Sequence, residues 1–397
     1  MIGGHWDPLR RQLERELPEA IKLRQQLHQQ PDLSSHEGPT RDIVLRALPH
    51  GAGARQVATT GAIIRIGGPG PAVAVRAELD ALPITEATGV PWASQRPGVM
   101  HACGHDIHLA AIVALARAVD AVGGPAPLLA VLQPREETYP SGARDIIRSG
   151  FLHEEAAVAT IAAHVQPLLG AGTVSCTVGA VNASNDEFTI TIKGRGGHAA
   201  YPHQTIDPVV ALAHVVIALQ TLVSRGVDPM APVTLSITTL SAGTAPNVIP
   251  DLTTAHGTIR ALDDATRHDV VRKLTEVVDL TARANGCIGS VAVTHGEPVL
   301  NNHAGIAHAT VPLLRGMGVE VDEALRSLGS DDFSYFSEGM PSLMMFVGTG
   351  AGGGDERLHS ATFAPADERI GHVAKALLAG YVAAAELSTH QRLTPRR

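Results

Sequence analysis

The feature that most constrains the fold is an alternation of short apolar strands with helices, interrupted once near the middle of the chain. Strand patterns at 72–77 and 128–132 flank a helix pattern at 107–122, and the alternation resumes after residue 299. Strands that alternate with helices are typical of an α/β layer built on a mostly parallel sheet. We therefore predict a mostly parallel mixed sheet with helices on both faces.

The interruption follows a different pattern, β-α-β-β-α-β, which is the ferredoxin-like split arrangement. Its first strand alternates, with Phe188, Ile190 and Ile192 on one face. A chain of 397 residues also exceeds the size at which one hydrophobic core usually stops growing. We predict a first domain at 1–180 and 299–397, with an inserted α+β domain at 181–298.

Composition excludes several classes of partner. The formal net charge is −8 and no run of Lys or Arg occurs, which argues against nucleic acid and anionic membranes. No stretch of ~18 uninterrupted apolar residues indicates a membrane span. The first ten residues lack the pattern of a secretory signal, and three cysteines are too few for a disulfide framework. These observations predict a cytoplasmic protein with a small-molecule substrate.

One short stretch, from Met100 to His108, holds three histidines, a cysteine and an aspartate. Cys103 and His105 are one residue apart, so in an extended or loop backbone their side chains can leave the same face and bind one metal ion or bridge two. We take His101 and His108 as orienting or helix-start residues.

Polar residues also follow predicted strands elsewhere, at the sheet edge where α/β proteins bind ligands. Taken singly, the Glu136-Glu137 pair would be a solvated surface pair, and a lone histidine would belong to the core or to a loop. Taken together, the nitrogen, sulfur and carboxylate groups are enough for two metal ions that share a bridge. These residues are Cys103, His105, Glu137, His164 and His359, with Asp80 and Glu136 at the same edge.

The inserted domain adds three candidate polar groups. His198 follows a glycine-rich turn, Asn247 lies on a loop between two prolines, and Arg260 lies on the next strand. The plain interpretation is that His198 and Asn247 only shape turns and that Arg260 is a solvated cation. The functional one is a histidine and an amide directed at an oxyanion, and a guanidinium that suits a carboxylate.

Seven motifs, in order along the chain, resemble the dinuclear metallohydrolase family that includes aminoacylase and glutamate carboxypeptidase. Within it they resemble the branch of hippurate hydrolase, N-acetyldiaminopimelate deacetylase and the auxin-conjugate hydrolases. The motifs lie at 23–28, 76–83, 101–106, 133–137, 197–199, 247–250 and 330–333.

The resemblance implies a zinc-peptidase-like catalytic domain with an inserted lid. It implies that the five residues above are the metal ligands, with Cys103 where sister branches use a bridging aspartate. It further implies Glu136 as general base and acid, and Asp80 as a carboxylate that supports the ligands. The lid forms homodimers in many members and can deliver His198 to the partner's active site.

The activity this implies is hydrolysis of the amide bond of N-acyl amino acids or related small conjugates by a metal-activated water. Zinc, manganese, cobalt and nickel all suit the ligands. Arg135 departs from the family pattern, and we expect its charge to depress the pKa of Glu136. Two alternatives stay open: a dipeptidase or carboxypeptidase, and a non-catalytic small-molecule-binding protein on the same scaffold.

Overall fold

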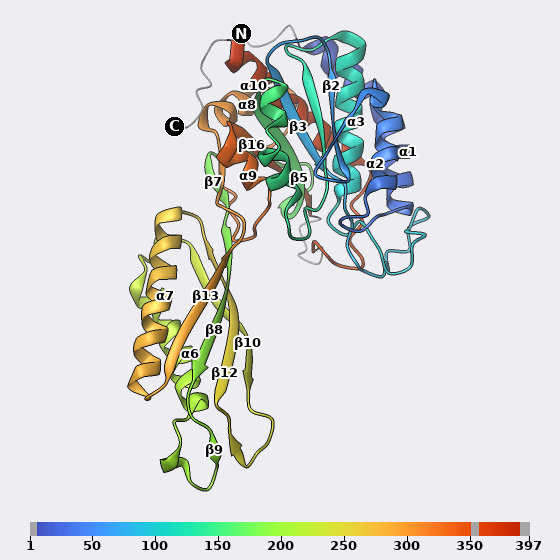
Figure 1. The fold of residues 1–397 in the computed structure, drawn as a ribbon. Coiled ribbons are helices and arrows are strands. Elements are labelled where there is room, and N and C mark those ends of the chain that lie inside the picture. Colours follow the sequence, from blue (N-terminus) through green and yellow to red (C-terminus); the bar gives the residue numbers. More distant parts are fainter. Residues whose placement is uncertain (1–5, 351–356, 390–397) are drawn as a thin grey trace. The chain divides into compact units, whose positions relative to one another are not determined.

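The computed structural model describes residues 6–350 and 357–389. The chain forms two compact units, which are treated separately here (Figure 1). The first unit comprises Met1–Gly179, Asn301–Leu325 and Asp332–Arg397, and the second comprises Ala180–Leu300 and Arg326–Asp331. The segment Arg326–Asp331 was assigned to the first domain by the sequence. It joins the second unit because its backbone bonds there, with Ala183 N donating to the carbonyls of Ser327 and Gly329.

The first unit contains an eight-stranded sheet in the order β1-β2-β4-β3-β5-β16-β6-β15. Parallel pairs join β3 to β4, β3 to β5, β5 to β16 and β6 to β15, so the sheet is mixed and mostly parallel, as predicted. Its strands are β1 (Arg55–Val57), β2 (Gly61–Ile66), β3 (Ala72–Glu78), β4 (Leu128–Gln133), β5 (Ala157–Gly170), β6 (Val174–Ser175), β15 (Val321–Asp322) and β16 (Ser342–Gly350).

Helices cover this sheet. They are α1 (Asp7–Gln29), α2 (Gly38–Ala47), α3 (His105–Val122), α4 (Gly142–Arg148), α5 (Phe151–Glu154), α8 (Ala304–Gly316), α9 (Ser334–Gly339) and α10 (Glu368–Thr389), with a 3-10 turn η1 (Gly51–Gly53). α3 and α10 are buried over most of their length and pack against each other and the central strands. α1 continues through Pro18, because its apolar stripe, from Leu9 to Leu27, packs on α3.

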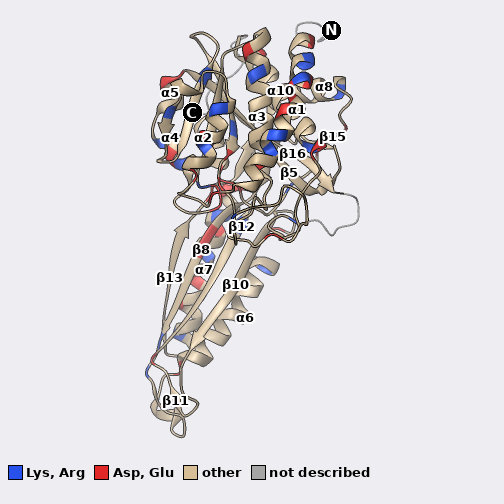
Figure 2. Cartoon of the chain, turned by 90° about the vertical axis from the view of Figure 1, so that its right-hand side faces the viewer, with Lys and Arg blue, Asp and Glu red and all other residues tan. Residues whose placement is uncertain are grey.

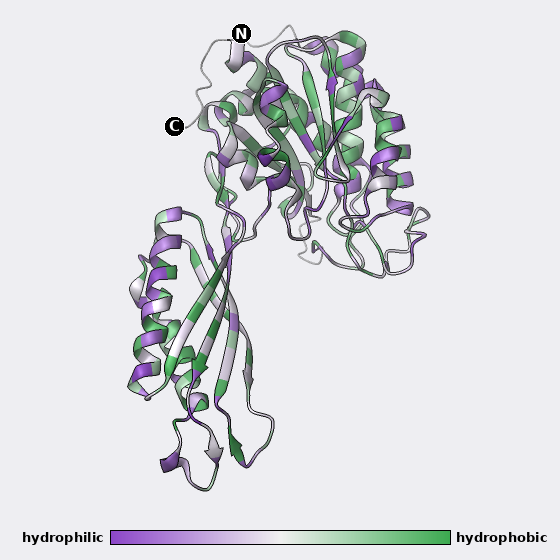
Figure 3. Cartoon of the chain, viewed as in Figure 1, coloured by the Kyte–Doolittle hydropathy of each residue, from purple (hydrophilic) through white to green (hydrophobic). Residues whose placement is uncertain are grey.

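The second unit is a four-stranded antiparallel sheet in the order β10-β12-β8-β13, with α6 and α7 packed on it. In chain order its elements follow the predicted β-α-β-β-α-β pattern. They are β8 (Ser184–Lys193), α6 (Pro208–Gly226), β10 (Val233–Ala242), β12 (Leu252–Ala261), α7 (Asp264–Ala284) and β13 (Ile288–His295). The alternating residues Phe188, Ile190 and Ile192 form its core, as predicted. Figure 3 shows the polar outer face of α7.

Small elements complete the chain. A two-stranded sheet pairs β9 (Gly197–His198) with β11 (Val248–Ile249), a second pairs β7 (Gly179–Asn182) with β14 (Leu300–Asn302), and η2 (Pro202–Gln204) is a 3-10 turn. Within residues 6–350 and 357–389, two helices, α6 and α10, are long and apolar enough to cross a membrane by length and composition alone. The apolar window of α10 is 72% buried inside the protein, which is typical of a core helix of a soluble protein.

The carboxyl ends of the central strands set the position of the candidate site. β3 ends two residues before Asp80, and β4 ends three residues before Glu136. The sequence placed His164 in a loop after a strand ending at 163, and this is wrong. β5 continues to Gly170, because it keeps pairing with β16, where His164 faces Phe346.

Candidate metal centre

Two groups of ligand-type side chains in the first unit share Cys103. One group is Cys103, His105 and His164, and the other is Cys103, Glu137 and His359. Within each group the potential ligand atoms all lie within 4.8 Å of one another. All five residues predicted from the sequence are therefore brought together, and Cys103 belongs to both groups.

Cys103 and His105 are positioned by the start of α3. Gly104 precedes the helix with φ at 88°, and a Cβ there would lie 2.5 Å from Cγ2 of Val165, so this position requires glycine. His105 Nδ1 donates to the carbonyl of Asp80 over 2.8 Å. In the neutral ring that bond leaves Nε2 without a proton, 3.8 Å from Glu136 Oε2. Burial opposes the charged form, but nearby Glu78, Glu137 and Asp80 outweigh burial and raise the pKa of His105, so without a metal ion they favour its protonated form.

His164 is also held as a neutral ligand. Its Nδ1 donates to the carbonyl of Val165 over 2.7 Å, and its Nε2 lies 3.4 Å from Cys103 Sγ. Burial, together with nearby His108, lowers the pKa of His164 to about 3. The ring therefore offers an unprotonated Nε2 at neutral pH, which is the form that binds metals.

The loop after β4 carries both glutamates. Glu137 N donates to Asp80 Oδ2 over 3.0 Å, and the same oxygen accepts from Ser34 Oγ at 2.7 Å. Glu137 Oε1 lies 3.3 Å from His359 Nε2. Burial opposes its charged form, but His359 and His105 outweigh burial and lower the pKa of Glu137. Glu137 is therefore an ionised carboxylate within the site.

His359 reaches the centre from the segment after β16. Its backbone N–H donates to the carbonyl of Ala102 over 2.9 Å, which fixes it beside Cys103. Its φ is 63°, in the left-handed region, and its side chain is 50% exposed. His359 is thus the solvent-facing member of the cluster.

The protonation state of Cys103 depends on what the site holds. Burial and the carboxylates of Glu137 and Glu136 raise the pKa of its thiol well above the usual range. The surrounding residues thus favour the neutral thiol, and the bridging thiolate expected from the sequence stays a prediction.

The residues present fit a metal centre. His105 Nε2 is buried and has no hydrogen-bond partner among the residues that the structure describes. A buried polar atom without a partner is costly, and its lone pair points toward sulfur and carboxylate groups of the kinds that bind zinc and similar ions. The donor set therefore matches divalent metal ions.

Sequence reasoning placed His108 among the orienting or helix-start residues but missed the partners through which it braces the ligands. His108 Nδ1 donates to Glu78 Oε2 over 2.8 Å, and its Nε2 accepts from Val165 N at 3.0 Å. Glu78 is also paired with Arg76, so this third cluster is satisfied internally and is structural. Arg76 and Glu78 were detectable as two charged residues on one face of an apolar strand. Ser34, which donates to Asp80, carried no such signal.

The second unit holds the other predicted residues. His198 on β9 pairs with Val248 on β11, and Ala199 N donates to the carbonyl of Asn247 over 3.0 Å, so His198 and Asn247 are neighbours. His198 Nδ1 accepts from Ala200 N at 3.0 Å, which leaves the proton of the neutral ring on Nε2.

The glycines beside His198 are required by crowding, since a Cβ on Gly196 would lie 2.4 Å from the carbonyl oxygen of Ile249. Arg260 is not part of this pair. Its guanidinium donates to the carbonyl of Leu328 over 3.1 Å, within the same unit.

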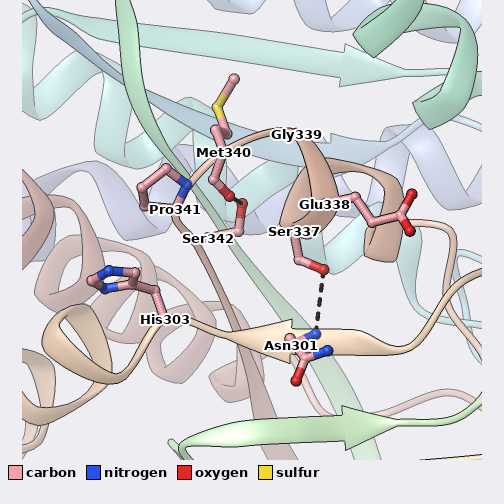
Figure 4. Close-up of a pocket in the computed structure, with 8 residues that line it drawn as sticks. All are labelled: Asn301, His303, Ser337, Glu338, Gly339, Met340, Pro341 and Ser342. Carbon is pink, nitrogen blue, oxygen red and sulfur yellow. Dashed lines mark hydrogen bonds between the residues drawn. The ribbon is translucent and has the colours of Figure 1, made fainter. Parts of the chain in front are cut away.

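A small cavity elsewhere in the first unit is not the candidate site. It has a volume of about 20 Å³ and is lined by residues of β14, α9 and the start of β16 (Figure 4). Asn301 N donates to Ser337 Oγ across it. It lies at the amino end of β16, whereas the ligand cluster follows the carboxyl ends of the strands, and its volume holds only about one water.

The chain resembles known proteins over most of its length. Residues 74–381 match the model of peptidase family M20/M25/M40. The chain is 36% identical over 359 residues to N-acetyl-L-cysteine deacetylase of Bacillus subtilis, covering 88% of this chain and 84% of that one. It is 35% identical over 344 residues to IAA-amino acid hydrolase ILR1-like 5 of Arabidopsis thaliana, covering 83% and 77%.

Among solved structures, it resembles a Bacillus subtilis protein described as a dinuclear metal binding peptidase from the M20 family. The TM-score is 0.82 at 30% identity, and the match covers 95% of this chain and 99% of that chain.

Proposed function

Because the chain belongs to peptidase family M20/M25/M40, we propose that it hydrolyses the amide bond of N-acyl amino acids or related small amino-acid conjugates. The observation that carries this proposal is the pair of ligand groups that share Cys103. Relatives named as an N-acetyl-L-cysteine deacetylase and an IAA-amino acid hydrolase support the substrate class.

Cys103, His105, Glu137, His164 and His359 would hold two divalent ions. When bound, such ions lower the pKa of a water and polarise the substrate carbonyl. We propose that both ions are zinc or manganese. Cobalt and nickel suit the same ligands. Asp80 supports the ligands, since its carbonyl orients His105 and its carboxylate accepts the N–H of Glu137.

Glu136 is the proposed general base and acid. Its Oε2 lies 3.8 Å from His105 Nε2, at the edge of the ligand cluster. As base it accepts a proton from the attacking water, and as acid it returns the proton to the leaving amine nitrogen. The adjacent Glu137 has the separate task of binding metal.

His198 and Asn247 are proposed to bind the substrate's carbonyl oxygen. The Nε2 proton of His198 suits an oxyanion that forms during attack, and Asn247 offers an amide next to it. Arg260 is the proposed partner of a free substrate carboxylate. It donates to Leu328, and substrate would have to compete for the guanidinium.

The second unit is proposed to mediate homodimerisation or higher association. Ile217 on α6 is 67% exposed and Leu240 on β10 is 60% exposed, so apolar side chains face outward there.

Basic and acidic residues are interspersed along the described chain (Figure 2). That distribution supports a small-molecule substrate rather than nucleic acid or a membrane as partner. A cytoplasmic location is part of the same proposal.

The test is turnover of a panel of N-acyl amino acids and amino-acid conjugates, with dipeptides alongside and metal analysis of the same sample. We expect hydrolysis of acyl amino acids by protein that carries two ions per chain, and loss of turnover after chelation. Preference for dipeptides would replace the proposal with a peptidase. A metal content near zero together with no turnover on any substrate would reject enzymatic function.

A further inference from the structure

Arg135, immediately before the two glutamates, has an unusual backbone. Its φ is 52°, in the left-handed region that non-glycine residues rarely occupy. Both of its backbone polar groups are bonded: its N–H donates to Glu37 Oε1 over 2.9 Å, and its carbonyl accepts from Gly142 N at 3.2 Å. A strained conformation persists only where its surroundings hold it firmly.

The side chain of Arg135 is held from three further directions. Its guanidinium donates to the carbonyl of Ala58 at 3.0 Å and to Asp145 Oδ2 at 2.5 Å, and its Nε donates to the carbonyl of Pro140 at 3.0 Å. The residue is only 6% exposed. The planar fork of arginine can satisfy three separate acceptors, whereas a lysine ammonium is a single point charge.

Glu37, which accepts the N–H of Arg135, is itself fixed. It is fully buried and also accepts from Ser35 N at 2.8 Å and Thr60 Oγ1 at 2.6 Å. Arg135 therefore ties the loop after β4 to α2, to the turn before β2 and to α4.

The partners of the Arg135 guanidinium are Asp145 and two carbonyls. The left-handed backbone turns the side chain toward α4, where Asp145 lies. The expected effect of its charge on the pKa of Glu136 stays a prediction. The contacts of Arg135 indicate that it fixes the conformation of the loop after β4.

We propose that Arg135 is a positioning residue: its fork holds the 134–137 loop so that Glu136 faces the substrate while Glu137 faces the metals. This inference rests on the proposed function. A misplacement of about 1 Å in a catalytic group can lower a rate by about 10²-fold, so the loop's conformation has a direct kinetic consequence.

The experiment compares Arg135→Lys, which keeps the charge, with Arg135→Ala, and uses Arg315→Lys as the control. Arg315 forms an ion pair with Glu323 but is 59% exposed and lies on α8, far along the chain from the loop. We expect both Arg135 variants to lose about 10- to 100-fold in kcat with KM within about twofold of wild type. We expect amide hydrogen exchange across 134–142 to accelerate in both, and the control to match wild type.

Three outcomes would overturn the inference. One is wild-type kcat in Arg135→Lys with a loss in Arg135→Ala, which would make charge the relevant property. The second is a shift of the acidic limb of the pH–rate profile to higher pH in Arg135→Ala, with no change in amide hydrogen exchange across 134–142. The third is a lower Tm with unchanged kcat and exchange.

Failure of the proposed function is distinguishable from these outcomes. In that case wild type turns over none of the substrates, and exchange across 134–142 in Arg135→Lys still shows whether the fork holds the loop. Unchanged exchange there would reject the positioning role by itself.

Discussion

The candidate metal centre and the glycine-rich turn of the second unit are built in opposite ways. In the centre, His105 and His164 are buried, and each is oriented by a hydrogen bond from Nδ1 to a carbonyl. In the turn, His198 and Asn247 are exposed, and the backbone pairing of β9 with β11 holds them.

The difference indicates two kinds of task. Burial and bonded partners hold His105 and His164 in a fixed orientation for metal binding, and the half-exposed His359 is fixed by its backbone bond to Ala102. A group that meets only the reacting substrate can stay exposed until substrate is bound. Changes in the first unit should therefore alter metal content or chemistry, and changes in the turn should alter chemistry alone.

The largest effect is expected at Glu136. Glu136→Gln removes the proton acceptor but keeps the shape of the side chain, so kcat should fall by about 10⁴-fold while metal content stays at the wild-type value. Glu137→Gln is the matched control one residue away, and it should lose metal. Steady-state kinetics with metal analysis would measure both, and wild-type turnover in Glu136→Gln would remove it from the mechanism.

A smaller effect is expected at His198. His198→Ala should lower kcat by about 10²–10³-fold, as loss of one oxyanion donor does elsewhere, with no change in bound metal. His203→Ala is the control, because His203 lies in the same exposed turn, with its ring 6.4 Å from that of Tyr201. A fall in metal content in His198→Ala would make His198 a ligand and erase the contrast between the two regions.

The sequence predicted those features that depend on local pattern and residue type. The family resemblance is confirmed, as is the mostly parallel sheet. It did not predict contacts made across long separations. The extension of β5 through His164 depends on pairing with β16, and the direction of the Arg135 side chain depends on a left-handed backbone. Neither feature produces a periodic pattern in the sequence.

The last prediction concerns Asp186, a buried charge in the second unit. Because this unit also contains a buried and fully bonded group, the contrast with the metal centre applies to the turn and not to the whole unit. Asp186 accepts two bonds from Arg267, at 2.8 and 2.6 Å, and one from His295 at 2.9 Å. Burial opposes its ionisation, but these bonds outweigh burial and lower the pKa of Asp186. A carboxyl whose pKa is lower in the folded state stabilises the protein above its unfolded pKa of about 3.9.

That stabilisation is lost as pH falls through the lower folded pKa. Asp186→Asn should therefore reduce the free energy of unfolding by about 2–4 kcal/mol at pH 7, since it leaves Arg267 buried without its charge partner. The gap to wild type should narrow only below about pH 4. Urea unfolding across pH, with hydrogen exchange of β8 and β13, would measure this. A gap that is independent of pH down to about 2 would show that packing, and not the charge, makes Asp186 important.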